Sequence, residues 1–441
     1  MLQSLRNAFK VKEIRRGILF TFLMLCVVRL GTSIPVPGVD VEQFKSWFAA
    51  LTDNNESFGF MDRFTGGSFE NMSILALNIT PYITSSIIIQ LLTIAFPKLE
   101  EMQREGESGR KKLVAATRYL TVGLAIMESV AMAIAFSRSN IVTGSNRWLM
   151  FIQIITSLTA GSAFLMWIGE RISEKGVGNG ISVVLTINIL SRMPSDIASL
   201  FNQFVIGRPI ARAVVGAIII LAIIVGMVVL VILLNSAERR IPVQYSQKLQ
   251  GRRMSGAGRS EIPLKVNTAG VMPIIFAMSL FQTPIILTQF IGRGRTAGWW
   301  SEFLNYLSQS RWCDPKNLKY SIGLLVYVLL IIFFAYFYTS ITFNPLQISE
   351  NMKKSGGFIP GIRPGKPTND YLTNILNHII FIGACGLTII SVLPFFFNGV
   401  FGASVSFGGT SLIIIVSVIL ETIKQIESQM MVRNYKGFLD D

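Results

Sequence analysis

Runs of about twenty apolar residues recur along the whole chain, and they restrict its possible folds more than any other feature. A helix of that length crosses the hydrocarbon core of a bilayer, where every backbone N–H and C=O must find its partner within the protein. Of the 441 residues, 51% are hydrophobic and only 15% are charged. The sequence therefore predicts an all-α polytopic membrane protein.

Ten candidate spans follow from the apolar runs. The fifth contains Arg192, Pro194 and Asp196, and the tenth runs into Glu421 and Lys424, yet both are needed to keep the flanking charge pattern consistent. We predict spans over residues 17–35, 73–96, 113–136, 148–168, 181–200, 213–234, 266–290, 321–343, 371–394 and 407–426.

The distribution of basic residues predicts the orientation. With the N-terminus in the cytoplasm, the cytoplasmic segments carry 26 Lys and Arg, and the opposite side carries 12 when Arg192 of the fifth span is counted with it. This bias predicts that both termini are cytoplasmic. Segment 291–320 departs from the rule, because it places five basic residues on the outer side.

Ten spans divide into two sets of five, and an odd number means that the second set enters the membrane upside down. The predicted halves are residues 1–205 and 206–441. The second span of each set contains a proline, Pro81 and Pro273, in a stretch rich in Asn, Thr, Ser or Gly. An inverted repeat explains this pairing, and so do two unrelated kinks.

Residue patterns typical of enzymes are missing from the sequence. The chain has one histidine, His378, and it has no metal-ligand cluster, no phosphate-binding glycine motif and no sign of a bound cofactor. We therefore expect a protein without catalytic activity.

An ion-coupled secondary transporter of small solutes is the main alternative, and such carriers need ionisable residues within the membrane. Arg29, Arg118 and Glu128 are the candidates. Both arginines lie near span ends, where their side chains are expected to snorkel towards water. Glu128 fits a proton site, and it equally fits pairing with polar groups of a neighbouring helix.

Two features favour the passage of something larger than a solute. Segment 57–73 mixes phenylalanines with glycines and charges, which suits a short re-entrant element enclosed by protein or water. The two longest cytoplasmic segments, 235–265 and 344–370, are strongly basic, and the first has seven basic residues against two acidic ones. A small-solute carrier has no evident use for them.

Motifs along nearly the whole chain resemble those of the SecY family of protein-conducting channels. They are SIPVPGVD (33–40), ITPYITSSIIIQLL (79–92), GVGNGIS (176–182), ERRIPVQY (238–245), QGRR (250–253), PLKVNTAGVMPIIFA (263–277), GFIPGIRPGKPT (357–368) and FGGTSL (407–412). The resemblance implies ten helices in two inverted halves around an hourglass pore, with a lateral gate to lipid between the second and seventh spans.

The resemblance also implies roles for individual residues. The pore ring falls on Ile79, Ile83, Ile181, Leu185, Ile275 and Ile414. The plug, within residues 57–73, includes Phe60, Met61, Phe64, Gly66 and Gly67. The lateral gate includes Pro81, Thr84, Gln90 and Pro273. The cytosolic docking surface includes Arg239, Arg240, Arg252, Arg253 and Arg363.

Partners are implied in the same way. The chain has no nucleotide site, so the resemblance implies that SecA or a translating ribosome drives the substrate. SecE and SecG are the expected small membrane subunits, and signal peptides, nascent chains and membrane lipids are the expected contacts. The expected location is the bacterial cytoplasmic membrane.

Overall fold

The computed structural model describes most of the chain. The described residues are 9, 11–54, 65–139, 141–142, 146–204, 210–245, 249–250, 253–254, 259–290, 298–308, 312–313, 318–401 and 409–436.

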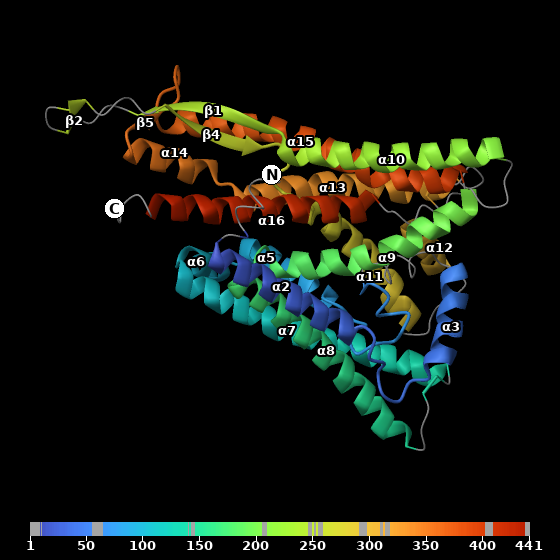
Figure 1. Cartoon of the computed structure of the whole chain (residues 1–441). Coiled ribbons are helices and arrows are strands. Elements are labelled where there is room, and N and C mark those ends of the chain that lie inside the picture. The colour runs from blue at the N-terminus through green and yellow to red at the C-terminus, as the bar shows by residue number, and fades with distance from the viewer. Residues whose placement is uncertain are drawn as a thin grey trace.

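A described helix overlaps each of the ten predicted spans (Figure 1). By length and composition, five of the described helices are able to cross a membrane, or up to six if the bent pair α5 and α6 forms one span. The ten helices are α2 (Lys12–Gly31), α5 (Thr80–Ala95), α7 (Glu107–Arg138), α8 (Arg147–Lys175), α9 (Gly180–Phe204), α10 (Ile210–Ser236), α11 (Met272–Phe290), α13 (Ser321–Thr342), α15 (Lys366–Phe401) and α16 (Gly409–Lys436).

Shorter elements connect these helices. The helices are α3 (Val41–Asn54), α6 (Pro97–Arg104), α12 (Trp299–Leu307), α14 (Pro345–Lys354) and the 3₁₀ turn η2 (Leu318–Tyr320). The strands are β1 (Glu238–Tyr245), β2 (Leu249–Gln250), β3 (Arg253–Met254), β4 (Arg259–Lys265) and β5 (Gly357–Phe358).

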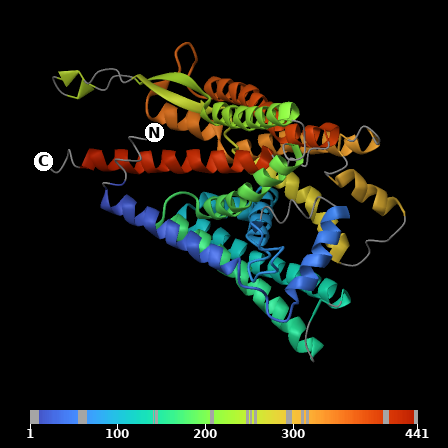
Figure 2. The ribbon, with the colours of Figure 1, turned by 45° about the vertical axis from the view of Figure 1, so that its right-hand side comes forward.

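The long helices form two groups. In one group α7 packs against α5 and α8, while α2 and α9 pack on α8; in the other, α13 packs against α11 and α15, while α10 packs on α15 and α16. The two groups meet where α9 contacts α16 and α10, and where α11 contacts α7. Figures 1 and 2 show α16 running along the boundary between the groups.

The second predicted span begins later than the sequence indicated. We predicted a start at residue 73, but α5 begins at Thr80, because the backbone before it turns at Asn78 with a φ of +52°. Pro81 lies in the first turn of α5, where its missing N–H breaks no helical hydrogen bond. Pro273 holds the same place in α11. Both prolines therefore begin a helix and do not kink one.

The basic segment 235–265 folds as a β-hairpin that the sequence analysis did not predict. Strands β1 and β4 pair antiparallel, and β5 adds to the other edge of β1. Successive side chains of a strand point to opposite faces, so Ile241 and Val243 are buried against α15 while Arg240 faces out. Strand β1 thus exposes Arg239 and Arg240.

The connecting elements gather at two ends of the molecule. Figure 1 shows the hairpin, α14 and α6 at the left end, and α3 and α12 at the right end. This grouping agrees with the two sides that the charge pattern separated.

Candidate functional site

The six residues of the predicted pore ring lie in one apolar cluster. They come from four elements that are far apart in the sequence: α5 with its N-cap residue, α9, α11 and α16. Ile79, Leu185 and Ile414 are buried, and Ile83, Ile181 and Ile275 pack against them while partly exposed. The structure therefore brings together all six aliphatic side chains.

Residues along α9 form three successive groups. The first lines a cavity, the second belongs to the predicted ring, and the third contacts the turn before α5. Asn179, just before the helix, and Ser182 line a cavity, while Ile181 and Leu185 belong to the ring. Ser191 lies about 9 Å beyond Leu185 at the helical rise of 1.5 Å per residue, and it contacts the turn that precedes α5.

The cavity occupies about 360 Å³ on the hairpin side of the ring. Leu185, Ile275 and Ile414 line it next to the ring. Its other walls are mostly polar and come from the ends of α10, β4 and α13 and from α16, where Glu421 and Lys424 add one charge of each sign. The cavity thus has polar residues along its walls and aliphatic ring residues at one end.

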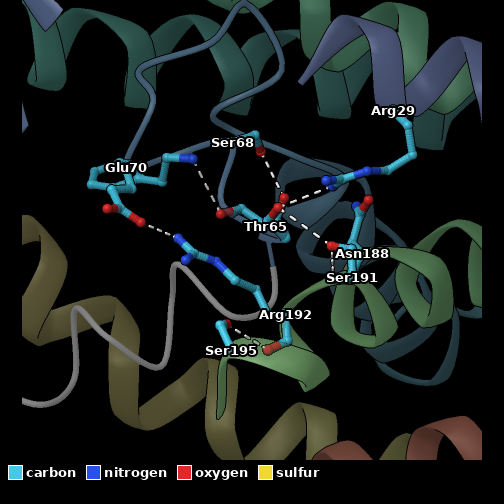
Figure 3. Close-up of polar contacts among 10 residues, drawn as sticks. Arg29, Thr65, Ser68, Glu70, Asn188, Ser191, Arg192 and Ser195 are labelled. Atoms are coloured by element: carbon cyan, nitrogen blue, oxygen red, sulfur yellow. Dashed lines mark hydrogen bonds and ion pairs between the residues drawn. The ribbon is translucent and has the colours of Figure 1, made fainter. Parts of the chain in front are cut away.

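On the other side of the ring, the turn at residues 65–79 is fixed by a set of polar contacts that we call the polar seam (Figure 3). Arg29 Nη1 of α2 donates to the carbonyl oxygen of Gly66 at 3.0 Å. Arg192 of α9 forms an ion pair with Glu70. Ser191 Oγ also approaches the Gly66 oxygen, at 3.5 Å. One segment is therefore held by two helices.

Buried asparagines complete the polar seam. Asn188 Nδ2 donates to Asn78 Oδ1 at 3.1 Å, and Ser162 Oγ of α8 donates to the Asn78 carbonyl oxygen at 3.2 Å. Both asparagines are 1% exposed. These bonds pair groups that would be costly to bury alone, so they fix the turn against α8 and α9, while Asn188 Oδ1 has no hydrogen-bond partner among the described residues.

Glycines are required where the turn meets α9. Gly66 and Gly67 have φ angles of +66° and +84°, a region that disfavours side chains. A Cβ on Gly66 would lie 2.8 Å from the carbonyl oxygen of Asn188. Of the predicted plug residues these two are described and belong to the polar seam, whereas Phe60, Met61 and Phe64 lie outside the described residues.

The contacts of Arg29 and Arg192 in the polar seam were not predicted from the sequence. We expected Arg29 to snorkel, but its side chain turns inward to Gly66. Arg118, for which we expected the same, has a 47% exposed side chain and places Nε 2.7 Å from Glu170 Oε1 on α8. A charged residue inside an apolar run indicates a polar contact within the protein, but the sequence does not show which residue is its partner.

The predicted lateral-gate residues lie on α5 and α11. Pro81 and Pro273 are buried, while Thr84 and Gln90 are partly exposed on α5. The Oε1 atom of Gln90 is buried without a hydrogen-bond partner among the described residues. Ile83 of α5 and Ile275 of α11 both pack against the ring cluster.

The predicted docking arginines are described in part. Arg239 and Arg363 are exposed. Arg240 is exposed too, but it pairs with Glu238 at 2.7 Å and approaches Glu261 at 3.7 Å, and the hydrogen bond to Glu238 raises its pKa. Arg253 lies in β3, and Arg252 lies outside the described residues.

Together, the fold and the site define a polytopic helical membrane protein with an apolar cluster between a partly polar cavity and the polar seam. A family model described as SecY matches residues 73–423. The protein translocase subunit SecY of Streptomyces scabiei is 42% identical over 452 residues, covering all of both chains. That of Mycobacterium tuberculosis H37Rv is 40% identical over 457 residues, again covering all of both. The chain belongs to the SecY family.

Solved structures share this fold. One described as a protein conducting channel matches with a TM-score of 0.64 at 17% identity, covering 94% of this chain and 93% of the other. Sec61 in a canine ribosome-channel complex matches with a TM-score of 0.62 at 17% identity and the same coverage.

Proposed function

We infer that the chain is a protein-conducting channel, which passes unfolded polypeptides across the membrane. The observation that carries this conclusion is the aliphatic ring, assembled from four elements between a polar cavity and the polar seam, in a chain of the SecY family. The relatives are named as translocase subunits, so their names give no enzymatic activity to transfer.

An aliphatic ring suits this task. It excludes water and ions because it offers them no polar partner, and it yields to a chain of any sequence because it makes no specific contact. Ile83 and Ile275 are the partly exposed members contributed by α5 and α11, so we propose that they meet the passing chain first.

The wider architecture follows the family. We propose ten membrane spans in two inverted halves, residues 1–205 and 206–441, around an hourglass pore. The support is a helix at each predicted span and two packed groups of helices with few contacts between them. Parting of α5 from α11 would open a lateral gate, through which an apolar segment gains about 25 cal/mol per Å² on leaving water for lipid.

Location and partners are proposed on the same basis. The hairpin, α14 and both termini would face the cytoplasm of a bacterium, since the predicted cytoplasmic segments hold most of the basic residues. SecE and SecG would complete the membrane complex, and SecA or the ribosome would supply the driving force. Channels of this fold have been solved bound to ribosomes, which supports the last of these partners.

The comparisons do not support the alternative of a small-solute carrier. Its chemical basis is also reduced, because Arg29 and Arg118 are engaged by protein partners. Glu128 is partly exposed on α7, and it makes no hydrogen bond or ion pair among the described residues. Its role is not assigned.

Site-specific crosslinking of an arrested substrate tests the function. A signal-bearing chain stalled in the complete complex should crosslink to a benzophenone amino acid at position 83 or 275. The same probe in place of Phe333, which is 57% exposed on α13, is the matched control and should not crosslink to the arrested segment. Transport of a labelled small solute without crosslinks at either ring position would contradict the channel.

A further inference from the structure

Three side chains from different parts of the chain are linked by hydrogen bonds along the wall of the cavity, on the hairpin side of the ring. Asn267, in the turn before α11, donates from Nδ2 to Asn235 Oδ1 at 2.8 Å. Asn235, near the end of α10, donates from Nδ2 to Ser417 Oγ of α16 at 2.7 Å. All three residues line the cavity, together with Leu185, Ile275 and Ile414 of the ring. We call them the amide relay.

Asn267, at one end of the amide relay, has a side-chain oxygen that accepts no hydrogen bond from the described residues. Asn267 is only 7% exposed, and its Oδ1 has no hydrogen-bond partner among the described residues. Two threonine hydroxyls of the cavity are already bonded within the protein: Thr268 Oγ1 donates to the Lys265 carbonyl at 2.7 Å, and Thr342 Oγ1 donates to the Tyr338 carbonyl at 2.9 Å. A buried, unsatisfied carbonyl costs free energy that an arriving N–H donor removes.

The amide relay is able to reverse its polarity. A serine hydroxyl both donates and accepts, so turning both amides around would preserve both hydrogen bonds of the relay. Asn267 would then present its NH₂ group in place of its carbonyl oxygen. The position next to the ring can thus offer either an acceptor or a donor.

Except at proline, a peptide group carries one N–H donor and one C=O acceptor, whatever the side chain. We propose that Asn267 is a binding site for the backbone peptide groups of a polypeptide entering the ring, an inference that rests on the proposed channel function. The amide relay binds peptide groups in either orientation, and it therefore guides the chain into the aliphatic ring without selecting a sequence. The Asn267 oxygen becomes accessible as the ring parts around the entering chain.

A backbone-ester substrate tests the proposal. A signal-bearing chain is made with one ester in place of an amide, so that a single N–H is missing, and it is arrested in the complete complex with the ester in the cavity. Losing one neutral hydrogen bond corresponds to about a fivefold effect. We expect the ester chain to slide back about fivefold faster than the amide chain in the wild-type channel, and at the same rate in Asn267→Leu.

Two further variants control the comparison. Asn267→Asp keeps an acceptor oxygen at this position, so the ester effect should persist. Thr342→Val removes a hydroxyl of the same cavity that is already satisfied internally, and it should leave the ester effect at the wild-type size. An ester effect of equal size in wild type and Asn267→Leu overturns the proposal.

Crosslinking gives a second measurement, which holds even if Asn267→Leu does not assemble. A diazirine placed beside the ester position reacts with its nearest neighbours in the wild-type channel. Adducts on Asn267 or Thr268 support the proposal, and adducts confined to Leu185, Ile275 and Ile414 overturn it. If the arrested chain crosslinks to neither Ile83 nor Ile275, the channel function itself fails.

Discussion

Single residues decide how tightly the aliphatic ring excludes water. Replacing Ile83 or Ile275 with Asn places a polar amide among the ring side chains, and an amide retains water where an aliphatic group repels it. We expect both variants to raise the resting ion conductance in planar bilayers and to accept defective signal sequences more readily. Phe333→Asn, on the outer face of α13, should leave the conductance unchanged. Wild-type conductance in both ring variants would remove these residues from the gate.

The ion pair between Glu70 and Arg192 is a residue-scale contact of the polar seam. Glu70→Gln keeps the shape and removes the charge, so the turn should separate from α9 more often and resting channel openings should become more frequent. Both side chains are partly exposed, which limits the loss to about 1 kcal/mol, or roughly a fivefold rise in open probability. Single-channel recording measures this rise.

Charge exchange is the decisive companion experiment for that ion pair. Glu70→Arg combined with Arg192→Glu should return the open probability towards wild type, since the pair is restored in reverse. Glu174→Gln, which breaks the exposed pair of α8 with Arg171, is the matched control and should have no effect. A double variant that leaks as much as Glu70→Gln would exclude the pair as a closing contact.

Sequence reasoning reached the residues of the ring and missed those of the polar seam, for a physical reason. The ring follows from a resemblance, because aliphatic residues inside apolar spans are otherwise indistinguishable from packing residues. The polar seam joins positions 37 and 122 residues apart, Arg29 to Gly66 and Glu70 to Arg192, and no local pattern predicts such pairs.

At the scale of elements, a long apolar run was enough to predict a helix. The turn before α5 and the β-hairpin could not be predicted in this way. The turn before α5 is apolar enough to be predicted as helix, yet its bonds go to α8 and α9. The hairpin was not predicted from the sequence. In ERRIPVQY the buried Ile241 and Val243 are separated by one exposed residue, as is typical of a strand.

Close packing between α8 and the turn gives a prediction about stability. A Cβ on Gly161 would lie 1.8 Å from the carbonyl oxygen of Ile74, so Gly161→Ala must push the turn away from the helix. Overpacking of this kind costs about 1–3 kcal/mol. We expect a lower midpoint of thermal unfolding for the purified protein in detergent. Gly123→Ala on α7, whose Cβ would meet nothing within 4 Å, should leave the midpoint unchanged or raise it slightly. Equal midpoints for the two variants would contradict the close packing.

The predicted plug is tested as an element. Deleting residues 60–67 removes Gly66 and with it the acceptor for Arg29, but it leaves Glu70 and the rest of the turn in place. We expect an assembled channel with raised resting ion permeability, measured in proteoliposomes. A sealed channel that no longer assembles with its membrane partner would show that the segment is structural.

At the scale of the whole molecule, the basic residues form a surface at one end, and charge bias alone explains part of it. The hairpin and the turn at 359–365 are joined through β5, so Arg363 and the hairpin arginines share one support. Reversing Arg252 and Arg253 to Glu should leave the membrane orientation intact, because ample positive charge remains. It should weaken ribosome binding most at low salt and make the remaining binding less dependent on salt, since each phosphate contact that is lost removes a salt-dependent attraction.

A substitution at Arg363 distinguishes most clearly between an effect of charge on membrane orientation and an effect on partner binding. Its guanidinium is exposed, while its carbonyl oxygen accepts a hydrogen bond from Thr368 Oγ1 at 2.8 Å, so the turn keeps its shape when the side chain is changed. A planar guanidinium binds a carboxylate through two parallel hydrogen bonds. An acidic side chain at the same position would repel that carboxylate. We expect Arg363→Glu to impair motor-driven translocation in inverted vesicles about tenfold, while Arg147→Glu, at the exposed start of α8 on the predicted outer side, changes nothing. Equal translocation by both variants, with wild-type affinity for the motor, would mean that the charge at position 363 serves orientation alone.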